Sequence, residues 1–418
     1  MSHHLSPLLK QASHVCVDHG KGSWLFDVEG KAYLDFTSGI GVTSTGHCHP
    51  HVVAAAQEQA GKVIHAQYTT VSHEPMLQLS DRLAGRMPKG IDSVAFSNSG
   101  SEAVETAMRL ARHATKRANI IVFNGGFHGR TLGAASLTTS GTKVRTGFHP
   151  LMAGVVVAPF PHAWRYGWSE EQTTEFCLNE LDHILKTQSA PSDTAALLIE
   201  PVQGEYGYYP ANAAFMRGLA ERCQQHGILL IADEVQAGYG RTGKFWSLDH
   251  FGVLPDIVVT AKGLASGFPL SAIGASAELM AKGMPGSQGG TYGANAVACA
   301  AALATLDVIE QEQLVENAAA RGQQMLGQLQ SLQSDYSWIA DIRGMGLMLG
   351  MEIAESPTRP LPDIAASITA ACEAEGLLLL RCGIDGQTVR FLPPLVVSEA
   401  EINDAMARLS RALQRVAV

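Results

Sequence analysis

Apolar and polar residues follow two alternating patterns from about residue 50 onward. Segments with apolar residues at helical spacing alternate with short apolar runs, which are typical of buried strands. We expect helices over residues 52–62, 74–86, 102–112 and 213–226, and strands over residues 93–97, 120–124, 195–200, 227–233, 257–260 and 271–275. This alternation predicts an α/β fold with a mostly parallel sheet covered by helices. Ligands of such sheets bind outside the carboxyl ends of the strands.

The pattern changes after about residue 310, where a smaller α+β domain is predicted. A long helix over 313–330 leads to a segment at 342–352, a helix over 362–375, strands over 377–381 and 388–391, and a final helix over 398–415. The turn-rich residues 1–48 carry strand-like pieces at 23–28 and 32–36 and are too few to form a core alone. We therefore expect a large domain of residues 49–310 and a small domain of residues 1–48 and 311–418.

Composition narrows the class of protein. The length of 418 residues predicts two or three domains. With 46% hydrophobic and 17% charged residues, the composition is that of an ordinary globular protein. The net charge of −9, without a basic block, argues against nucleic acid or an anionic membrane as the main partner. The 42 glycines exceed the usual share of about 7%, which indicates many positions of positive φ or close backbone approach.

Features that would direct the chain to a membrane or an oxidising compartment are not apparent. No apolar run reaches the roughly 18 residues that cross a bilayer, and the Ala-rich run at 293–309 predicts a buried helix instead. Residues 1–4 do not begin a charged-then-apolar leader, so we expect no signal peptide. The seven cysteines are scattered and form no CxxC pair. We expect reduced thiols in a cytoplasmic protein.

Three groups of polar residues at the predicted strand ends suit a ligand site. At 97–102, Gly100 and the Ser101 hydroxyl open a helix whose unpaired amides suit a phosphate, although an ordinary capping box explains the same residues. Asp233 ends an apolar strand, where it faces the ligand crevice or caps a helix. Lys262 has few charged neighbours, so it is either a partly desolvated amine suited to imine formation or a solvated surface lysine.

Three further loops offer groups of mixed chemistry. Residues 125–130 supply an aromatic ring and a guanidinium, residues 200–205 supply two carboxylates, and residues 289–293 form a Gly-rich turn before a helix. Each group is a weak signal when it is taken alone.

Two other motifs resemble sites that we do not expect to form. Residues 238–244 have the spacing of a phosphate-binding P-loop, but Phe245 stands where a Mg²⁺-binding hydroxyl is needed. Residues 47–51 gather His47, Cys48, His49 and His51, but Pro50 and the tight spacing hinder convergence on one tetrahedral ion. We expect a buried turn there and no metal site.

The ordered motifs SNSGSEA, FHGRT, EPVQGE, ADEVQ, TAKG and GGTYG resemble the class III pyridoxal-phosphate (PLP) aminotransferases, and most of all the bacterial 4-aminobutyrate aminotransferases. The resemblance covers nearly the whole chain. It implies PLP fold type I and a homodimer whose active site lies at the subunit interface. It also implies that Lys262 binds PLP covalently and shuttles a proton, while Asp233 keeps the pyridine nitrogen protonated.

The resemblance assigns the other site residues as well. The cofactor contacts that it implies are Gly100, Ser101, Phe127, His128, Glu200, Asp233, Val235, Gln236, Lys262 and, across the interface, Thr291. The substrate contacts are Ile40, Arg130, Glu205 and Arg390. Arg130 would bind a distal carboxylate and Arg390 an α-carboxylate, with Glu205 pairing to Arg390 while an amine substrate is bound.

The reaction implied is transfer of an amino group from 4-aminobutyrate or a similar amine to 2-oxoglutarate. Tyr206 and Tyr208 depart from the usual residues beside Glu205, so the donor stays open. An amino-acid racemase or epimerase, an acetylornithine-type aminotransferase and an acceptor such as pyruvate remain alternatives. A catalytically dead scaffold is disfavoured because Lys262, Asp233 and Thr291 are all present.

Overall fold

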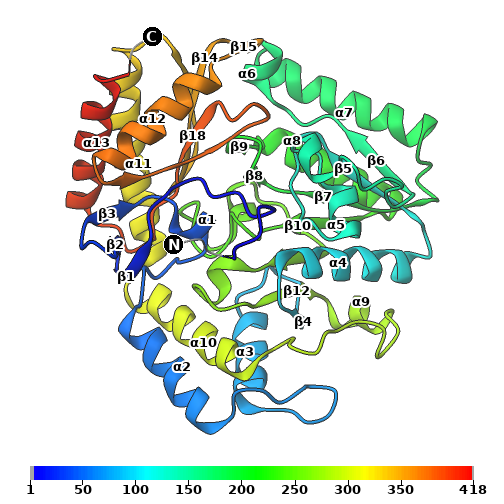
Figure 1. Cartoon of the computed structure of the whole chain (residues 1–418). Helices are drawn as coiled ribbons and strands as arrows, with labels where there is room; N and C mark the ends of the chain where they lie inside the picture. Colours follow the sequence, from blue (N-terminus) through cyan, green and yellow to red (C-terminus); the bar gives the residue numbers. More distant parts are fainter. Residues whose placement is uncertain (1–3, 417–418) are drawn as a thin grey trace.

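The computed structural model describes residues 4–416 and is built around a seven-stranded sheet (Figure 1). Its strands, in spatial order, are β4 (Ser93–Ser97), β12 (Ser271–Ala275), β11 (Ile257–Thr260), β10 (Leu229–Asp233), β7 (Thr194–Ile199), β5 (Asn119–Phe123) and β6 (Val155–Ala158). Strand β12 runs antiparallel to both neighbours, and the other neighbouring pairs are parallel. The predicted mostly parallel sheet is therefore confirmed.

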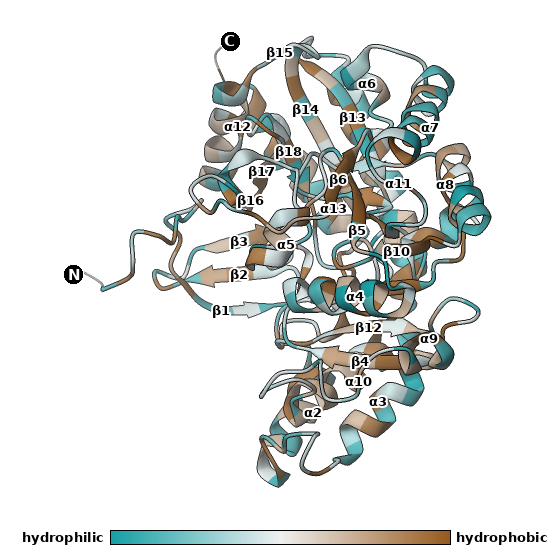
Figure 2. Cartoon of the chain, turned by 90° about the vertical axis from the view of Figure 1, so that its right-hand side faces the viewer, coloured by the Kyte–Doolittle hydropathy of each residue, from teal (hydrophilic) through white to brown (hydrophobic). Residues whose placement is uncertain are grey.

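Helices cover both faces of this sheet because successive strand residues point to opposite sides. Ile121 of β5 and Leu197 of β7 pack under α7 (Glu170–Thr187) and α8 (Ala213–His226). Their neighbours Ile120 and Leu198 pack under α4 (Gly100–Thr115) and α5 (Leu132–Leu137). Figure 2 shows the apolar strands β5, β6 and β10 among helices whose outer faces are hydrophilic.

Three helices pack beside the large sheet, on the side of β4 and β12. They are α2 (Pro50–Lys62), α3 (Glu74–Ala84) and α10 (Ala296–Gln311). The predicted buried helix at 293–309 is thus α10, of which Ala298, Ala301 and Ala302 lie in the core. Helix α2 begins at Pro50, before the expected start, because a proline fits the first turn and the His49 side chain caps it.

The two ends of the chain pack together in a smaller unit (Figure 1). Strands β1 (Val17–Lys21), β2 (Trp24–Asp27) and β3 (Ala32–Asp35) join β16 (Leu377–Leu378), which pairs in parallel with β3. A second sheet contains β13 (Ile339–Met345), β14 (Met348–Ser356), β18 (Thr388–Phe391) and β17 (Leu380–Cys382), with β15 (Arg359–Pro360) beside β14. Helices α11 (Leu314–Gln333), α12 (Pro362–Ala374) and α13 (Glu399–Leu413) cover them. The domain limits at 48/49 and 310/311 stay a prediction.

The remaining elements are short. They are α1 (Ser38–Gly41), α6 (Ala163–Tyr166), α9 (Ala277–Ala281), β8 (Val202–Gln203), β9 (Tyr209–Pro210) and the single 3₁₀ turns η1 (Thr142–Val144), η2 (Ser247–His250) and η3 (Lys262–Leu264).

Within residues 4–416, no helix is both long and apolar enough to cross a membrane. The start of the chain, on which the expectation of no signal peptide rests, lies partly outside those residues.

Candidate active site

A cavity of about 290 Å³ lies at the carboxyl end of the large sheet. Strands β4, β5, β7, β10 and β11 all run in one direction, so the loops that follow them meet at this edge. The residues lining it are Val42, Asn98, Ser99, Gly100, Ser101, Phe127, His128, Gly129, Glu200, Glu205, Asp233, Val235, Gln236, Ala261, Lys262, Gly267, Phe268, Pro269 and Leu270. The strand-end groups predicted from the sequence are thereby brought together.

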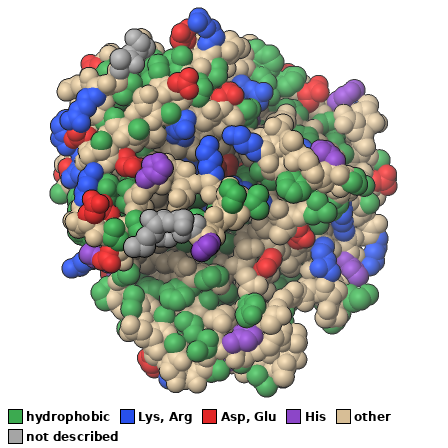
Figure 3. Space-filling model, in the orientation of Figure 1, with side chains coloured by type: hydrophobic (Ala, Val, Ile, Leu, Met, Phe, Trp, Pro, Cys, Tyr) green, Lys and Arg blue, Asp and Glu red, His purple; other side chains and the backbone are tan. Residues whose placement is uncertain are grey.

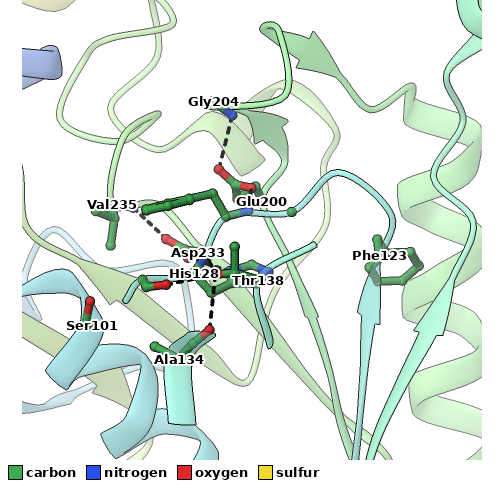
Figure 4. A network of polar contacts seen from close by, with 12 residues as sticks. Ser101, Phe123, His128, Ala134, Thr138, Glu200, Gly204, Asp233 and Val235 are labelled. Carbon is green, nitrogen blue, oxygen red and sulfur yellow. Dashed lines mark hydrogen bonds and ion pairs between the residues drawn. The ribbon is translucent and has the colours of Figure 1, made fainter. Parts of the chain in front are cut away.

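Asp233 is the last residue of β10 and is almost fully buried. Its Oδ2 lies 2.8 Å from Nδ1 of the buried His128, and its Oδ1 accepts a hydrogen bond of 3.1 Å from the backbone N–H of Val235 (Figure 4). The Thr138 hydroxyl in turn accepts from the backbone N–H of His128. The carboxylate is therefore held in one orientation at the cavity wall.

Glu200 forms hydrogen bonds with two loops of the site. Its Oε2 accepts a 2.7 Å hydrogen bond from the backbone N–H of Phe127, and its Oε1 accepts one of 3.1 Å from the N–H of Gly204. Burial raises the pKa of this carboxyl above its usual range. Glu200 thus fixes the loop that carries Phe127 against the loop that carries Glu205.

Lys262 follows β11 and has a left-handed backbone, with φ of 47°. A non-glycine residue in this region is strained, and such strain is concentrated at functional sites. Burial lowers the pKa of its amine, against the opposing influence of Glu205 and Asp233. A lowered pKa increases the fraction of amine with a free lone pair, as a nucleophile and proton acceptor needs.

The first turn of α4 forms the floor of the cavity next to Val235. Ser99 caps the helix, and Glu102 completes the capping box, so the capping-box interpretation of this motif is confirmed. The amides of Gly100 and Ser101 follow the cap and have no acceptor within the helix. A Cβ on Gly100 would lie 3.1 Å from Val235 Cγ1, and one on Gly129 would collide with Ser101 Oγ. Small residues therefore keep this helix start open to a ligand.

Gln236 carries a buried polar atom without a partner. Its Oε1 makes no hydrogen bond with any described residue, although the side chain is only 8% exposed at the cavity wall. Leaving such a group unpaired costs about 1–3 kcal/mol, so a bound group with complementary polar atoms would relieve it.

An ion pair closes one side of the cavity. Arg390 Nη1 lies 2.7 Å from Glu205 Oε1, and Arg390 is only 5% exposed. Glu205 lines the cavity, whereas Arg390 is absent from its lining. Burial would raise the pKa of Glu205, but the charge and the hydrogen bond of Arg390 outweigh it and lower that pKa. Glu205 thus screens the guanidinium from the cavity.

Arg343 of β13 holds both halves of this ion pair in place. Its Nε donates a 2.7 Å hydrogen bond to the carbonyl of Gly207, two residues beyond Glu205. Its Nη2 donates to Glu352, whose Oε2 also accepts from the hydroxyl of Thr388, two residues before Arg390. The sequence motifs gave no indication of this network, because its members are distant in the chain.

Besides Arg390, three of the expected site residues do not line this inner cavity. Arg130 stacks over Phe127 with 5.5 Å between its guanidinium carbon and the ring centre, and it lines a neighbouring cavity. Thr291 is exposed and does not line the cavity of its own chain. Ile40 has a φ of 68° and is 41% exposed on α1, while its neighbour Val42 lines the cavity. Sequence reasoning missed Val42 and gave no role to Phe268.

The two motifs set aside on sequence grounds have structural roles. His47, His49 and His51 pair with Asp35, Glu312 and Asp307, respectively, and residues 4–416 hold no cluster suited to a metal. The expected buried turn is wrong, because none of residues 47–51 is buried and the last two of them begin α2. In the P-loop-like segment, the buried Arg241 donates to the carbonyl of Leu347, and no helix follows directly.

Comparison with known proteins identifies the family. The family model of class III aminotransferases matches residues 8–413. The chain is 39% identical to 5-aminovalerate aminotransferase of Pseudomonas aeruginosa over 97% of this chain and 95% of that protein. It is also 39% identical to 4-aminobutyrate aminotransferase of Escherichia coli over 96% of this chain and 94% of that protein.

A solved structure supports the same assignment. The PLP-bound form of an amine transaminase from an uncultivated Pseudomonas species matches with a TM-score of 0.92 and 30% identity, over 100% of this chain and 98% of that one. The chain belongs to the class III aminotransferases and is a PLP-dependent enzyme of fold type I.

Proposed function

We propose that the inner cavity holds PLP, with Lys262 as the covalent attachment point and Asp233 beside the pyridine nitrogen. When bound, PLP supplies an electron sink for the carbon that loses its proton. The fit rests on the open start of α4 for the phosphate, the buried and unpartnered Gln236 Oε1, and the fixed Asp233 carboxylate. Phe127 and Val235 would contact the ring, while Glu200 and His128 hold the loop and the carboxylate in place.

The reaction that we propose is transfer of an amino group from an ω-amino acid to 2-oxoglutarate. The observation that carries it is the Glu205–Arg390 ion pair of 2.7 Å at the cavity wall. A donor without an α-carboxylate leaves Arg390 without a substrate partner, and Glu205 neutralises the guanidinium in that case. Glutamate or 2-oxoglutarate brings its own carboxylate, which replaces Glu205. The relatives named for 4-aminobutyrate and 5-aminovalerate support this class of donor.

Lys262 moves the proton in each half-reaction. Its lowered pKa, caused by burial, allows Nζ to accept a proton from the substrate carbon and to donate it to a different atom. Asp233 is held in one orientation for the ring nitrogen, because His128 and the Val235 amide each contact one of its carboxylate oxygens.

Arg390→Ala is expected to slow the glutamate half-reaction by about thirty-fold or more and to affect the ω-amino acid half-reaction far less. Loss of one close, charge-assisted pair with substrate costs about 2–5 kcal/mol, and only glutamate makes that pair. Each half-reaction is measured alone by stopped-flow absorbance of the cofactor. Glu205→Gln is expected to slow the ω-amino acid half-reaction more than the glutamate half-reaction.

Arg359→Ala is a matched control, because Arg359 lies on β15 of the same smaller unit, is exposed, and lines neither the inner cavity nor its neighbour. Equal slowing of both half-reactions by Arg390→Ala would show that Arg390 is structural. An acceptor such as pyruvate, or an epimerase reaction, would then account better for the site.

A panel of donors tests the function itself. The holoenzyme is incubated with 4-aminobutyrate, 5-aminovalerate or acetylornithine, together with 2-oxoglutarate or pyruvate, and glutamate and alanine are quantified. Our proposal predicts glutamate from the two ω-amino acids. Faster turnover of acetylornithine would assign the alternative donor, and formation of alanine alone would reject 2-oxoglutarate as the acceptor.

We place Thr291 in the active site of the partner subunit of a homodimer. It is exposed and lies outside the cavity of its own chain. Lys262→Ala and Thr291→Ala subunits are therefore expected to regain activity in mixed dimers, where one site receives both native residues. Activity is measured after subunit exchange, with each homodimer as a control. No recovery, together with impaired Thr291→Ala homodimers, would place Thr291 in its own subunit's site.

The same proposal includes a cytoplasmic location. Seven cysteines are free in the described structure, and five of them are buried, including Cys177 and Cys299, whose pKa is raised to about 12 by burial. Thiols of this kind are unreactive and suit a reducing compartment.

A further inference from the structure

A second, larger cavity adjoins the inner one. Its volume is about 570 Å³, against about 290 Å³ for the inner cavity, and the two share Phe127 and Glu205 in their walls. The inner cavity must hold both PLP and the reacting end of a substrate. The far end of a longer substrate would therefore pass between Phe127 and Glu205 into the outer cavity.

Four cationic side chains line this outer cavity: Arg130, Lys143, Arg145 and Arg381. None of them forms an ion pair with a carboxylate among residues 4–416, whereas many other arginines of the chain do. The anionic groups in the lining are Asp385 and Glu205. Glu205 is already neutralised by Arg390, so the cavity carries an excess of positive charge in a chain whose net charge is −9.

These cations are carried by segments that belong to different parts of the fold. Lys143 lies on η1 and Arg145 follows it, while Arg381 lies on β17 of the smaller unit. Arg381 donates to the carbonyls of Pro362 and Gly386, which fixes its side chain. Figure 3 shows Lys and Arg side chains gathered around a hollow near the middle of one face.

The outer cavity is also joined to the loop that carries Glu205. The backbone N–H of Gly383, which lines the outer cavity, donates a 2.9 Å hydrogen bond to the carbonyl of Glu205. A ligand bound among the outer cations thus lies against the same loop that faces the inner cavity. Clefts lined by one sign of charge focus the electric field and attract ligands of the opposite charge.

We propose that Lys143, Arg145 and Arg381 form a subsite for a carboxylate at the far end of a long donor. The substrate class is the linear ω-amino acids whose chain extends beyond the carboxylate position of 4-aminobutyrate. This inference rests on the proposed function, because it requires the amine to react in the inner cavity. Arg130 contacts a short donor's carboxylate, and the other three cations accept that of a longer one.

The first experiment measures binding, so that it does not depend on turnover. Isothermal titration calorimetry of the holoenzyme compares octanoate, butyrate and the neutral octan-1-ol. The variant is Lys143→Gln/Arg145→Gln, and the control is Lys89→Gln, an exposed lysine outside both cavities. Octanoate affinity is expected to fall about tenfold in the double variant and to stay unchanged in the control. Equal octanoate affinity in the variant and the wild type would overturn the subsite.

The second experiment uses turnover of donors of increasing length. For 8-aminooctanoate, kcat/KM is expected to fall about tenfold in the double variant, mainly through KM, while octylamine and 4-aminobutyrate are affected less than threefold. A uniform loss for all three donors would overturn the subsite and indicate a structural defect. If wild-type enzyme transaminates no ω-amino acid, the proposed function fails, whereas the calorimetric result still decides whether the cations bind a distal carboxylate.

Discussion

Lys262→Ala is expected to abolish turnover while leaving the fold intact. Its amine both attaches the cofactor and transfers the proton, and general acid–base catalysis alone contributes about 10²- to 10⁴-fold. Alanine, like lysine, carries a Cβ at the left-handed φ of 47°, so the substitution adds no backbone strain. The measurement is kcat with an ω-amino acid donor, together with the visible absorption of the purified protein.

Lys89→Ala serves as the control, because Lys89 is exposed and lies outside the cavity. PLP is expected to remain bound to the Lys262→Ala variant through the start of α4, without the absorption of the covalently attached form. Activity of more than about a few per cent of wild type would contradict the role of Lys262.

Asp233→Asn is expected to lower kcat by roughly 10²- to 10³-fold, which is the usual cost of removing one preorganised electrostatic group. The amide has nearly the same shape: its oxygen can accept from the N–H of Val235, and its NH2 group can donate to Nδ1 of His128 when that nitrogen carries the lone pair, so folding is preserved. It carries no charge and cannot stabilise a protonated pyridine nitrogen. Single-turnover kinetics with a saturating donor measure this effect without interference from product release.

Asp256→Asn is the matched control. Asp256 precedes β11 at the opposite edge of the same sheet and accepts a 2.7 Å hydrogen bond from the backbone N–H of Leu230. Its substitution is expected to leave single-turnover rates unchanged. Near-normal rates in Asp233→Asn would reject the proposed electrostatic role.

Much of the large sheet could be predicted from the sequence, because its buried strands are short apolar runs that end in polar residues. The bounds of β4, β11 and β12 are those expected. No element could be assigned to segment 342–352 from the sequence. It spans the hairpin of β13 and β14, and the turn at Gly346 leaves no clear break in the apolar pattern. The expected strand at 377–381 is instead two strands, β16 and β17, in two different sheets.

The candidate site shows the same division between local and distant information. Residues at strand ends, such as Asp233 and Lys262, were predictable because parallel strands deliver their ends to one edge. Arg343 and Glu352 were not, because their roles depend on contacts to Gly207 and Thr388 that only the folded chain creates. The cations Lys143 and Arg145 lie on a short turn without a distinctive pattern, and their common cavity with Arg381 is likewise a tertiary feature.

The most direct test of the account is a single-turnover reaction of the holoenzyme with one ω-amino acid and no acceptor. We predict one equivalent of the aldehyde product per active site, with conversion of the cofactor to its amine form, and its recovery when 2-oxoglutarate is added. A racemase or epimerase would return the proton to the carbon from which it came. Exchange of that proton with solvent, without any aldehyde product, would contradict the assignment as a transaminase.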